Sequence, residues 1–214
     1  MTPKNSQHLD ALMDIRSMME KSSRFISLSG LSGIGAGLIA LLGAAIAYIY
    51  LDTTPLRNYP GYYLVNEGYE KWGIDYRLFF VGLGAVILLG ALATGIFFTT
   101  RKARRNQQAI WGALTRRLLL NLSIPLAVGG VFCLALFQQG IIGFIAPATL
   151  IFYGLALINA SKYTLRDIRF LGLSEIVLGL IGLFNLGYGL DLWAFGFGVL
   201  HIVYGAIMYY KYER

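Results

Sequence analysis

Charged residues are scarce in this chain. They make up 14% of its 214 residues, whereas 57% of the residues are hydrophobic. A soluble globular domain carries about 25% charged residues, so the composition excludes an ordinary soluble protein. The mean hydropathy of +0.61 leads to the same conclusion. We therefore expect an integral membrane protein.

Cysteine and histidine are also rare. The single cysteine, Cys133, lies within an apolar run, so an intramolecular disulfide is impossible and we expect a small buried packing residue. The two histidines are His8, in the N-terminal tail, and His201, in an apolar segment. Their separation argues against a haem held by both, and we predict neither a metal site nor a cofactor.

Signatures of membrane enzymes are missing as well. The sequence has no HExxH zinc motif, no phosphate-binding glycine loop and no aspartate cluster suited to lipid-phosphate transfer. The stretch Gly30–Gly33 fits the GxSG pattern of intramembrane rhomboid proteases, but their serine opens the fourth helix and this one lies in the first apolar segment. We predict no catalytic residue, and an intramembrane enzyme ranks third among the functions considered.

Apolar segments long enough, or nearly long enough, to cross a bilayer occur six times, since a span takes about 20 residues. The third and fourth meet at Gln138–Gly140, and the fifth and sixth meet near Gly187–Asp191, which predicts two tight antiparallel hairpins. Pro125 and Pro147 are expected to kink the helices that contain them. The six segments are residues 26–50, 78–100, 118–137, 141–159, 170–188 and 192–210.

The predicted fold is all-α, with six transmembrane helices arranged as three tandem helical hairpins at residues 25–100, 118–159 and 170–210. Residues 120–154 match residues 171–205 at seven of 35 positions without a gap, which suggests that the hairpins are repeats. Parallel repeats of this kind are related by an axis along the membrane normal and are known among transporters.

Lysine and arginine lie almost entirely on one side of these segments. Only Arg57, Lys71 and Arg77 fall on the other side, in or directly after the loop of residues 51–76, so fifteen of the eighteen basic residues share one face. Because basic segments stay in the cytoplasm, both termini are predicted to be cytoplasmic. The net charge of +7 thus reflects topology, and we expect no nucleic-acid partner.

Two segments outside the predicted spans have a distinct character. Residues 5–22, within the predicted cytoplasmic tail 1–24, are expected to form an amphipathic helix that either lies on membrane lipid or binds a cytoplasmic protein. The external loop 51–76 is rich in aromatic residues and either caps the outer membrane interface or covers a ligand site as a lid. Its aromatic residues are Tyr59, Tyr62, Tyr63, Tyr69, Trp72 and Tyr76.

Small residues Ser29, Gly33 and Gly37 recur at four-residue spacing on one face of the first helix. Such a face lets another helix approach closely. We favour packing within the chain, and contact between two copies in a homo-oligomer stays open.

Ionisable and amide side chains within the apolar segments are candidate ligand-binding or ion-path residues, because a polar group at membrane depth is costly. Glu175 is expected near the cytoplasmic end of its helix, paired with Arg169 or with the basic segment 101–117. His201 is expected near the middle of the last helix, bonded to Asn121, Asn185 or a backbone carbonyl. These four residues form the candidate path.

The stretch Lys21–Gly33, KSSRFISLSGLSG, together with hairpins that begin with basic residues, resembles an uncharacterised family of bacterial six-helix integral membrane proteins. The resemblance implies a location in the bacterial inner membrane. It implies no activity, ligand or catalytic residue.

These observations favour a non-enzymatic membrane protein, a sensor or regulatory scaffold with a cytoplasmic docking face. The alternative is a small-solute or ion transporter built from parallel two-helix repeats. A polar cavity that joins Glu175 to His201 would favour transport, whereas a solid apolar core would favour the scaffold.

Overall fold

The computed structural model describes residues 28–59, 68–107 and 110–214. The predicted all-α fold is confirmed: helices dominate, and in the described residues five are long and apolar enough to cross a membrane. A further apolar helix, α7 (Ile168–Phe184), has 17 residues. The five are α2 (Gly30–Tyr50), α4 (Tyr76–Arg105), α5 (Ala113–Gln138), α6 (Ile145–Ala160) with its leading 3-10 turn η1 (Ile142–Phe144), and a composite C-terminal helix (Leu186–Tyr212).

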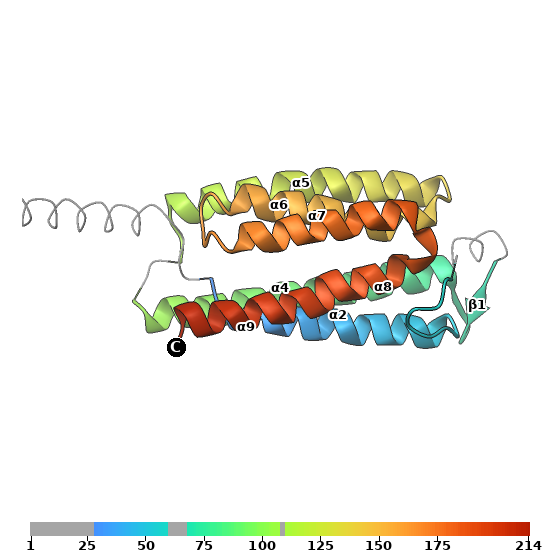
Figure 1. Ribbon diagram of the computed structural model, residues 1–214, viewed down its shortest axis with the longest axis horizontal. Helices are drawn as coiled ribbons and strands as arrows, with labels where there is room; N and C mark the ends of the chain where they lie inside the picture. Colours follow the sequence, from blue (N-terminus) through green and yellow to red (C-terminus); the bar gives the residue numbers. More distant parts are fainter. Residues whose placement is uncertain (1–27, 60–67, 108–109) are drawn as a thin grey trace, which may run out of the picture.

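The helices form two layers of three (Figure 1). In the first layer, α2 lies between α4 and the C-terminal helix; in the second, α6 lies between α5 and α7. The last helix therefore returns to the first one. The predicted hairpin 170–210 is divided between the layers, because α7 packs mainly on α6 and the C-terminal helix packs mainly on α2.

The C-terminal helix is built from four pieces. It begins with a 3-10 turn, η2 (Leu186–Tyr188), followed by α8 (Gly189–Trp193), a π-helix η3 (Ala194–Leu200) and α9 (His201–Tyr212). The turn predicted near Gly187–Asp191 is therefore found two residues earlier. The chain reverses at Asn185, which leaves the helical region with φ −135° and ψ 58° and ends α7 four residues earlier than predicted.

The other predicted turn is found where the sequence indicates it. Helix α5 ends at Gln138, and Gly140 adopts a φ of +72°, a conformation that suits glycine.

Helix α4 begins two residues before the predicted start. The carboxylate of Asp75 accepts hydrogen bonds from the N–H groups of Arg77 at 2.8 Å and Leu78 at 3.3 Å, so it caps the helix from Tyr76 onward.

Glycine contacts bring helices together within each layer. A Cβ added to Gly33 would lie 3.2 Å from both the Cα of Gly205 and the carbonyl oxygen of His201, and one on Gly37 would collide with Gly198 and Ile202. The face that contains Ser29, Gly33 and Gly37 thus lies against the C-terminal helix of the same chain. In the second layer, Gly154 and Gly172 make the equivalent contact between α6 and α7.

Pro125 lies inside α5 and lacks the N–H that would bond the carbonyl of Asn121. Asn159 of α6 satisfies that carbonyl instead, through its side-chain amide at 3.0 Å. Pro147 was predicted to lie inside a helix and kink it, but it does not. It lies in the first turn of α6, where no intrahelical N–H bond is required.

Aromatic side chains close the end of the molecule that carries the two-stranded hairpin of β1 (Glu70–Lys71) and β2 (Ile74–Asp75). Tyr50 and Tyr76 are buried there, and Tyr69 donates to the carbonyl of Tyr50 at 3.0 Å. Trp72 is 58% exposed at the rim, and Tyr59 packs against the buried rings. These residues form a packed cap; Tyr62 and Tyr63 lie outside the described residues.

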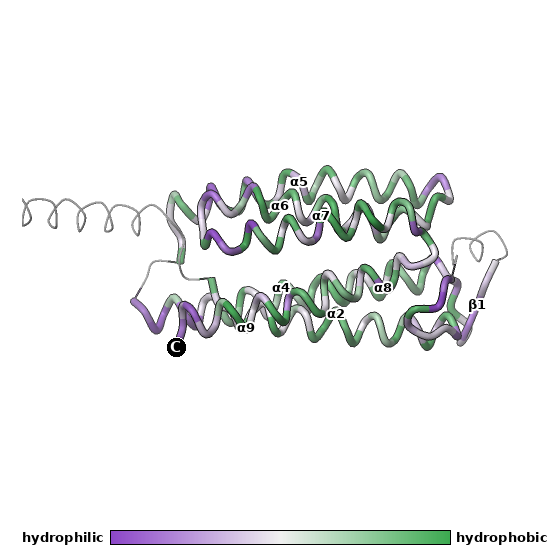
Figure 2. Tube along the Cα trace, in the orientation of Figure 1, coloured by the Kyte–Doolittle hydropathy of each residue, from purple (hydrophilic) through white to green (hydrophobic). Residues whose placement is uncertain are grey.

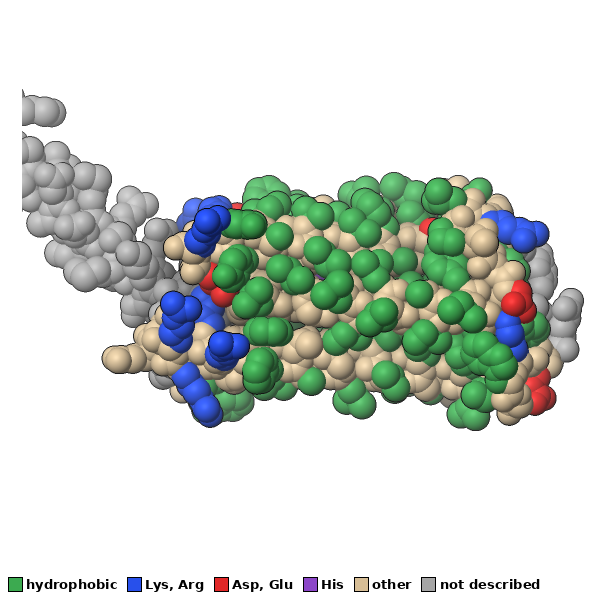
Figure 3. Space-filling view, turned by 90° about the horizontal axis from the view of Figure 1, so that it is seen from below, with side chains coloured by type: hydrophobic (Ala, Val, Ile, Leu, Met, Phe, Trp, Pro, Cys, Tyr) green, Lys and Arg blue, Asp and Glu red, His purple; other side chains and the backbone are tan. Residues whose placement is uncertain are grey.

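The surface divides along the long axis of the molecule. Hydrophobic residues run along all helices between two more polar ends (Figure 2). Lysine and arginine gather at the end where the C-terminus lies, with a few acidic side chains among them, and the opposite end also carries both signs of charge (Figure 3). This pattern fits a multi-pass membrane protein. The predicted amphipathic helix 5–22 lies outside the described residues.

Candidate functional site

Three polar side chains meet in the interior, and we call them the His201 cluster. Glu175 of α7 is fully buried and His201 is 6% exposed; the Oε1 atom of Glu175 lies 3.4 Å from the Nδ1 atom of His201. The hydroxyl of Tyr153, on α6, lies 2.8 Å from the other ring nitrogen of His201, Nε2. Both sides of the imidazole are thus engaged.

The His201 cluster joins the two layers. Tyr153 and Glu175 belong to the second layer, whereas His201 belongs to the first. An apolar cluster also joins the layers, in which Met208 of α9 is buried with Leu157 of α6 and Leu171 of α7. The imidazole of His201 therefore acts as a polar link across the interface between layers.

The π-helix η3 shapes the site. Its wider turn places the carbonyl oxygen of Gly196 3.0 Å from the Nδ1 atom of His201. A Cβ on Gly196 would collide with the carboxylate of Glu175 and with Leu150, so glycine is what lets the carboxylate approach this backbone. Single π turns are rare and are frequently found at functional sites.

The hydrogen-bond partners of His201 restrict which atoms of the His201 cluster can carry a proton. The carbonyl of Gly196 can only accept, so the Nδ1 atom of His201 must carry a proton, and Nε2 of a neutral ring accepts from the Tyr153 hydroxyl. Within the described residues, neither carboxylate oxygen of Glu175 has a hydrogen-bond partner. A buried carboxylate without compensation is very costly. Glu175 is therefore either protonated itself or paired with a protonated His201.

Apolar and aromatic side chains surround the His201 cluster. The ring of Phe197 stacks on the imidazole of His201 at 5.8 Å between centroids and lies 4.9 Å from the ring of Tyr153. Leu150, which is fully buried, faces Gly196. Such walls keep the local dielectric low and strengthen every charge interaction inside them.

The structure separates the four residues of the predicted path. It brings Glu175 and His201 together, but Asn121 and Asn185 bond within their own helices, to the carbonyls of Arg117 at 2.8 Å and Ile181 at 2.9 Å. The expected pairing of Glu175 with Arg169 or the segment 101–117 is also wrong. Glu175 lies two helical turns into α7, beyond the reach of these interfacial cations, and faces His201 instead.

Tyr153 was missed in the sequence analysis. The signal that could have identified it is a hydroxyl group in the middle of the apolar segment 141–159, where a buried tyrosine needs a partner. The same reasoning that singled out His201 applies to it.

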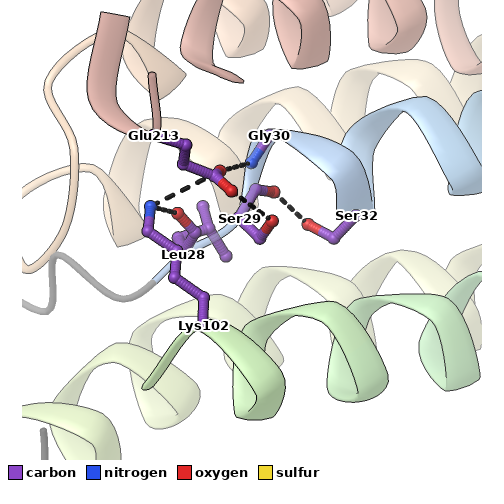
Figure 4. Close-up of polar contacts among 6 residues, drawn as sticks. All are labelled: Leu28, Ser29, Gly30, Ser32, Lys102 and Glu213. Carbon is purple, nitrogen blue, oxygen red and sulfur yellow. Dashed lines mark hydrogen bonds and ion pairs between the residues drawn. The ribbon is translucent and has the colours of Figure 1, made fainter. Parts of the chain in front are cut away.

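A second polar cluster fastens the first layer at the basic end (Figure 4). The carboxylate of Glu213 accepts from the hydroxyl of Ser29 at 3.1 Å and from the N–H of Gly30. Lys102 of α4 lies 3.5 Å from the same carboxylate and donates to the carbonyl of Leu28 at 2.7 Å. The end of α9 is thereby tied to the start of α2, where the positive end of the helix dipole favours an anion, and to the end of α4.

A third polar contact links the layers at the same end. Asp167 precedes α7 and accepts from the ammonium of Lys211 at 2.8 Å and from the hydroxyl of Tyr212 at 2.9 Å. The hydrogen bond from Lys211, aided by that from Tyr212, lowers the pKa of Asp167 below its usual value despite partial burial. At the opposite end, Asp191 accepts from Tyr48 at 2.6 Å and from the N–H of Leu56 at 2.8 Å, which fastens the first layer there.

Nowhere in residues 28–59, 68–107 and 110–214 do three His, Cys, Asp or Glu side chains lie close enough to hold a metal ion. No family model, curated protein or solved structure matches the chain. The function is therefore inferred from the His201 cluster and its place between the layers.

Proposed function

We propose that this chain is a non-enzymatic integral membrane protein that spans the bilayer six times and acts as a proton-responsive sensor or regulatory scaffold. Gain or loss of a proton at the His201 cluster would change how the two layers meet. One observation carries this proposal: a fully buried carboxylate, Glu175, has no hydrogen-bond partner in the described residues and faces an imidazole across the interface.

Charge balance explains why protonation would matter. With one proton to share, the Glu175–His201 pair is neutral, either as acid and imidazole or as carboxylate and imidazolium. A second proton gives the pair a charge of +1, and removal of the first gives −1. A net charge at membrane depth is costly. Either change therefore favours a state in which the layers separate enough for water to reach the pair.

The contacts described above support movement of the layers as units. Glu213 and Asp191 fasten the first layer at both ends, and close glycine contacts hold α6 against α7 in the second. Between the layers, the polar links include the His201 cluster and the bonds of Asp167 with Lys211 and Tyr212. A change at one link therefore acts on the whole interface.

The proposed orientation of the chain in the membrane rests on the distribution of basic residues. We propose that both termini, the segment 101–117 and the connection at residues 160–169 lie in the cytoplasm of a bacterial cell, with the chain in its inner membrane. The amphipathic segment 5–22 would present the signal to a cytoplasmic partner. Fifteen of the eighteen basic residues support this orientation.

The proposal is tested with the full chain in lipid nanodiscs. Spin labels are placed at Val86→Cys on α4 and Val131→Cys on α5, which are exposed positions on different layers, in a Cys133→Ala background. Distances between the labels are measured across a pH series, and the carboxylic-acid carbonyl stretch of Glu175 is followed by infrared difference spectroscopy.

We expect the distance distribution and the infrared band to change together with pH in the native chain. Glu175→Gln should abolish both changes. The matched control is Ser174→Ala, which removes a neighbouring hydroxyl that bonds only to the carbonyl of Phe170 in its own helix; both changes should persist in it. Distances that stay constant over the whole pH series would refute the proposal.

A second candidate, a proton-coupled transporter of a small solute or ion, is favoured by the π-helix beside His201. A π turn next to an ionisable residue is a frequent feature of functional sites. In this second candidate, the transporter would be built from parallel two-helix repeats. Proton flux into liposomes, reported by an enclosed pH-sensitive dye, separates the two: flux that is lost in Glu175→Gln indicates transport, whereas pH-dependent distances without flux indicate a sensor.

A further inference from the structure

The outer face of α9 carries a shallow, open apolar groove. Val203, Ile207 and Tyr210 are exposed in it and lie within the candidate membrane span Leu186–Tyr212. Its lining residues are Ile202, Val203, Ala206, Ile207, Tyr210 and Lys211.

The length of the groove matches one leaflet of a bilayer. Nine residues separate Ile202 from Lys211, which at 1.5 Å per residue corresponds to about 14 Å along the helix. The hydrocarbon core of a bilayer is about 30 Å thick, so one leaflet contributes about half of this. An acyl chain seated against Ile202 would thus end near Lys211.

The charged end of the groove suits a phosphate group. The side chain of Lys211 is 53% exposed, and the guanidinium of Arg214 lies 5.6 Å from the ring of Tyr210, which lines the groove. Asp167 is the acid that faces Lys211, at 2.8 Å. The neighbouring carboxylate of Glu213 is engaged instead with Ser29 and Gly30 at the start of α2.

We propose that this groove binds one anionic phospholipid, with an acyl chain along Ile202, Ala206 and Ile207 and the headgroup phosphate on Lys211 and Arg214. The phosphate competes with Asp167 for the ammonium of Lys211. Lipid binding therefore loosens the link between the layers at this end. This last consequence rests on the proposed function, whereas the binding itself does not.

Native mass spectrometry of the full chain released from detergent tests the binding. Phosphatidylglycerol and phosphatidylcholine with identical acyl chains are compared at equal concentration, so that the lipids differ only in the headgroup, which is anionic in the first and zwitterionic in the second. We expect more phosphatidylglycerol than phosphatidylcholine to be retained, by about fivefold for one lysine contact. Equal retention of the two lipids would overturn the proposal.

Variants locate the site. Lys211→Gln should lower the preference for phosphatidylglycerol about fivefold, since Arg214 remains, and Lys211→Arg should keep it. Ala206→Phe should lower retention of both lipids by filling the groove. The matched control is Lys162→Gln, which removes an exposed lysine from the second layer that bonds to Asn159 at 3.3 Å. Loss of the preference in Lys162→Gln to the same extent as in Lys211→Gln would show unspecific attraction and refute the site.

Asp167→Asn distinguishes competition from a structural role of Lys211. Removal of this carboxylate frees the ammonium, so retention of phosphatidylglycerol should rise above the native level. A fall would contradict the proposal. These outcomes do not depend on pH sensing: if the label distances on Val86 and Val131 fail to respond to pH while the lipid preference stands, the proposed function fails and the lipid site survives.

Discussion

Replacement of His201 tests the physical basis of the site directly. His201→Leu removes the acceptor of the Tyr153 hydroxyl and the donor to the Gly196 carbonyl, and it leaves Glu175 without its polar neighbour. Each buried polar group that loses its partner costs about 1–3 kcal/mol. With the Tyr153 and Gly196 groups both affected, the free energy of unfolding should fall by about 2–6 kcal/mol, while Glu175 can limit its own cost by holding a proton.

His201→Gln is the matched variant. Its amide supplies one donor and one acceptor, so it can bond the carbonyl of Gly196 and the hydroxyl of Tyr153 and should lose about 1 kcal/mol or less. The double variant Glu175→Leu with His201→Leu should be more stable than the sum of the single losses predicts, because no unpaired charge remains.

The assay is reversible unfolding in mixed micelles, followed by circular dichroism with increasing denaturant, on the native chain and all variants. If His201→Leu is as stable as the native chain, the bonds to His201 contribute nothing and the described network is not what joins the layers. Additive losses in the double variant would show that Glu175 and His201 are not coupled. Stability retained in His201→Gln together with lost pH response would assign the imidazole to proton binding.

Three further predictions concern other parts of the chain. Gly196→Ala should lower the free energy of unfolding by about 1–3 kcal/mol, because the added Cβ would overpack the site. Gly84→Ala is the control measured in the same micelles: a Cβ at Gly84 meets open space, so this variant should not destabilise the protein. Because its pKa is lowered in the folded chain, Asp167 contributes stability above its ordinary pKa, and this stability is lost as pH falls through the lowered value. The thermal unfolding temperatures of the native chain and of Asp167→Asn should therefore differ most near neutral pH and converge in acid. A difference that stays constant with pH would exclude ionisation of Asp167 as its cause. Arg104→Cys should react with a membrane-impermeant maleimide only from the cytoplasmic side, and labelling from outside would reverse the proposed orientation.

Helix positions and the general class of this protein follow from the sequence because hydrophobic length and hairpin turns are local signals. The run that becomes α5 and the turn at Gly140 are examples. The return of the last helix to α2 has no such local signal. It depends on which glycine faces fit together, and with 26 glycines in the chain many pairings are compatible with the sequence.

The same limit applies to the candidate site. Glu175 and His201 could be identified because each is an ionisable residue in an apolar segment. Their contact could not, because the π-helix changes which side of the C-terminal helix faces α7, and periodicity of 3.6 residues per turn does not predict that rotation. Tyr153 escaped attention because tyrosine is common at membrane interfaces, and only its depth distinguishes it.

The packing of α2 against the C-terminal helix also sets a constraint on biosynthesis. The α2 face that contains Gly33 and Gly37 meets its partner only after residues 186–212 have been synthesised, whereas α5, α6 and α7 can assemble as soon as they emerge. At 5–20 residues per second, roughly 7–30 s pass between the synthesis of α2 and that of its partner. During this time the glycine face of α2 stands open to lipid or to the insertion machinery, so a ribosome that stalls before residue 186 would leave a membrane-inserted chain with one complete layer and one that cannot close.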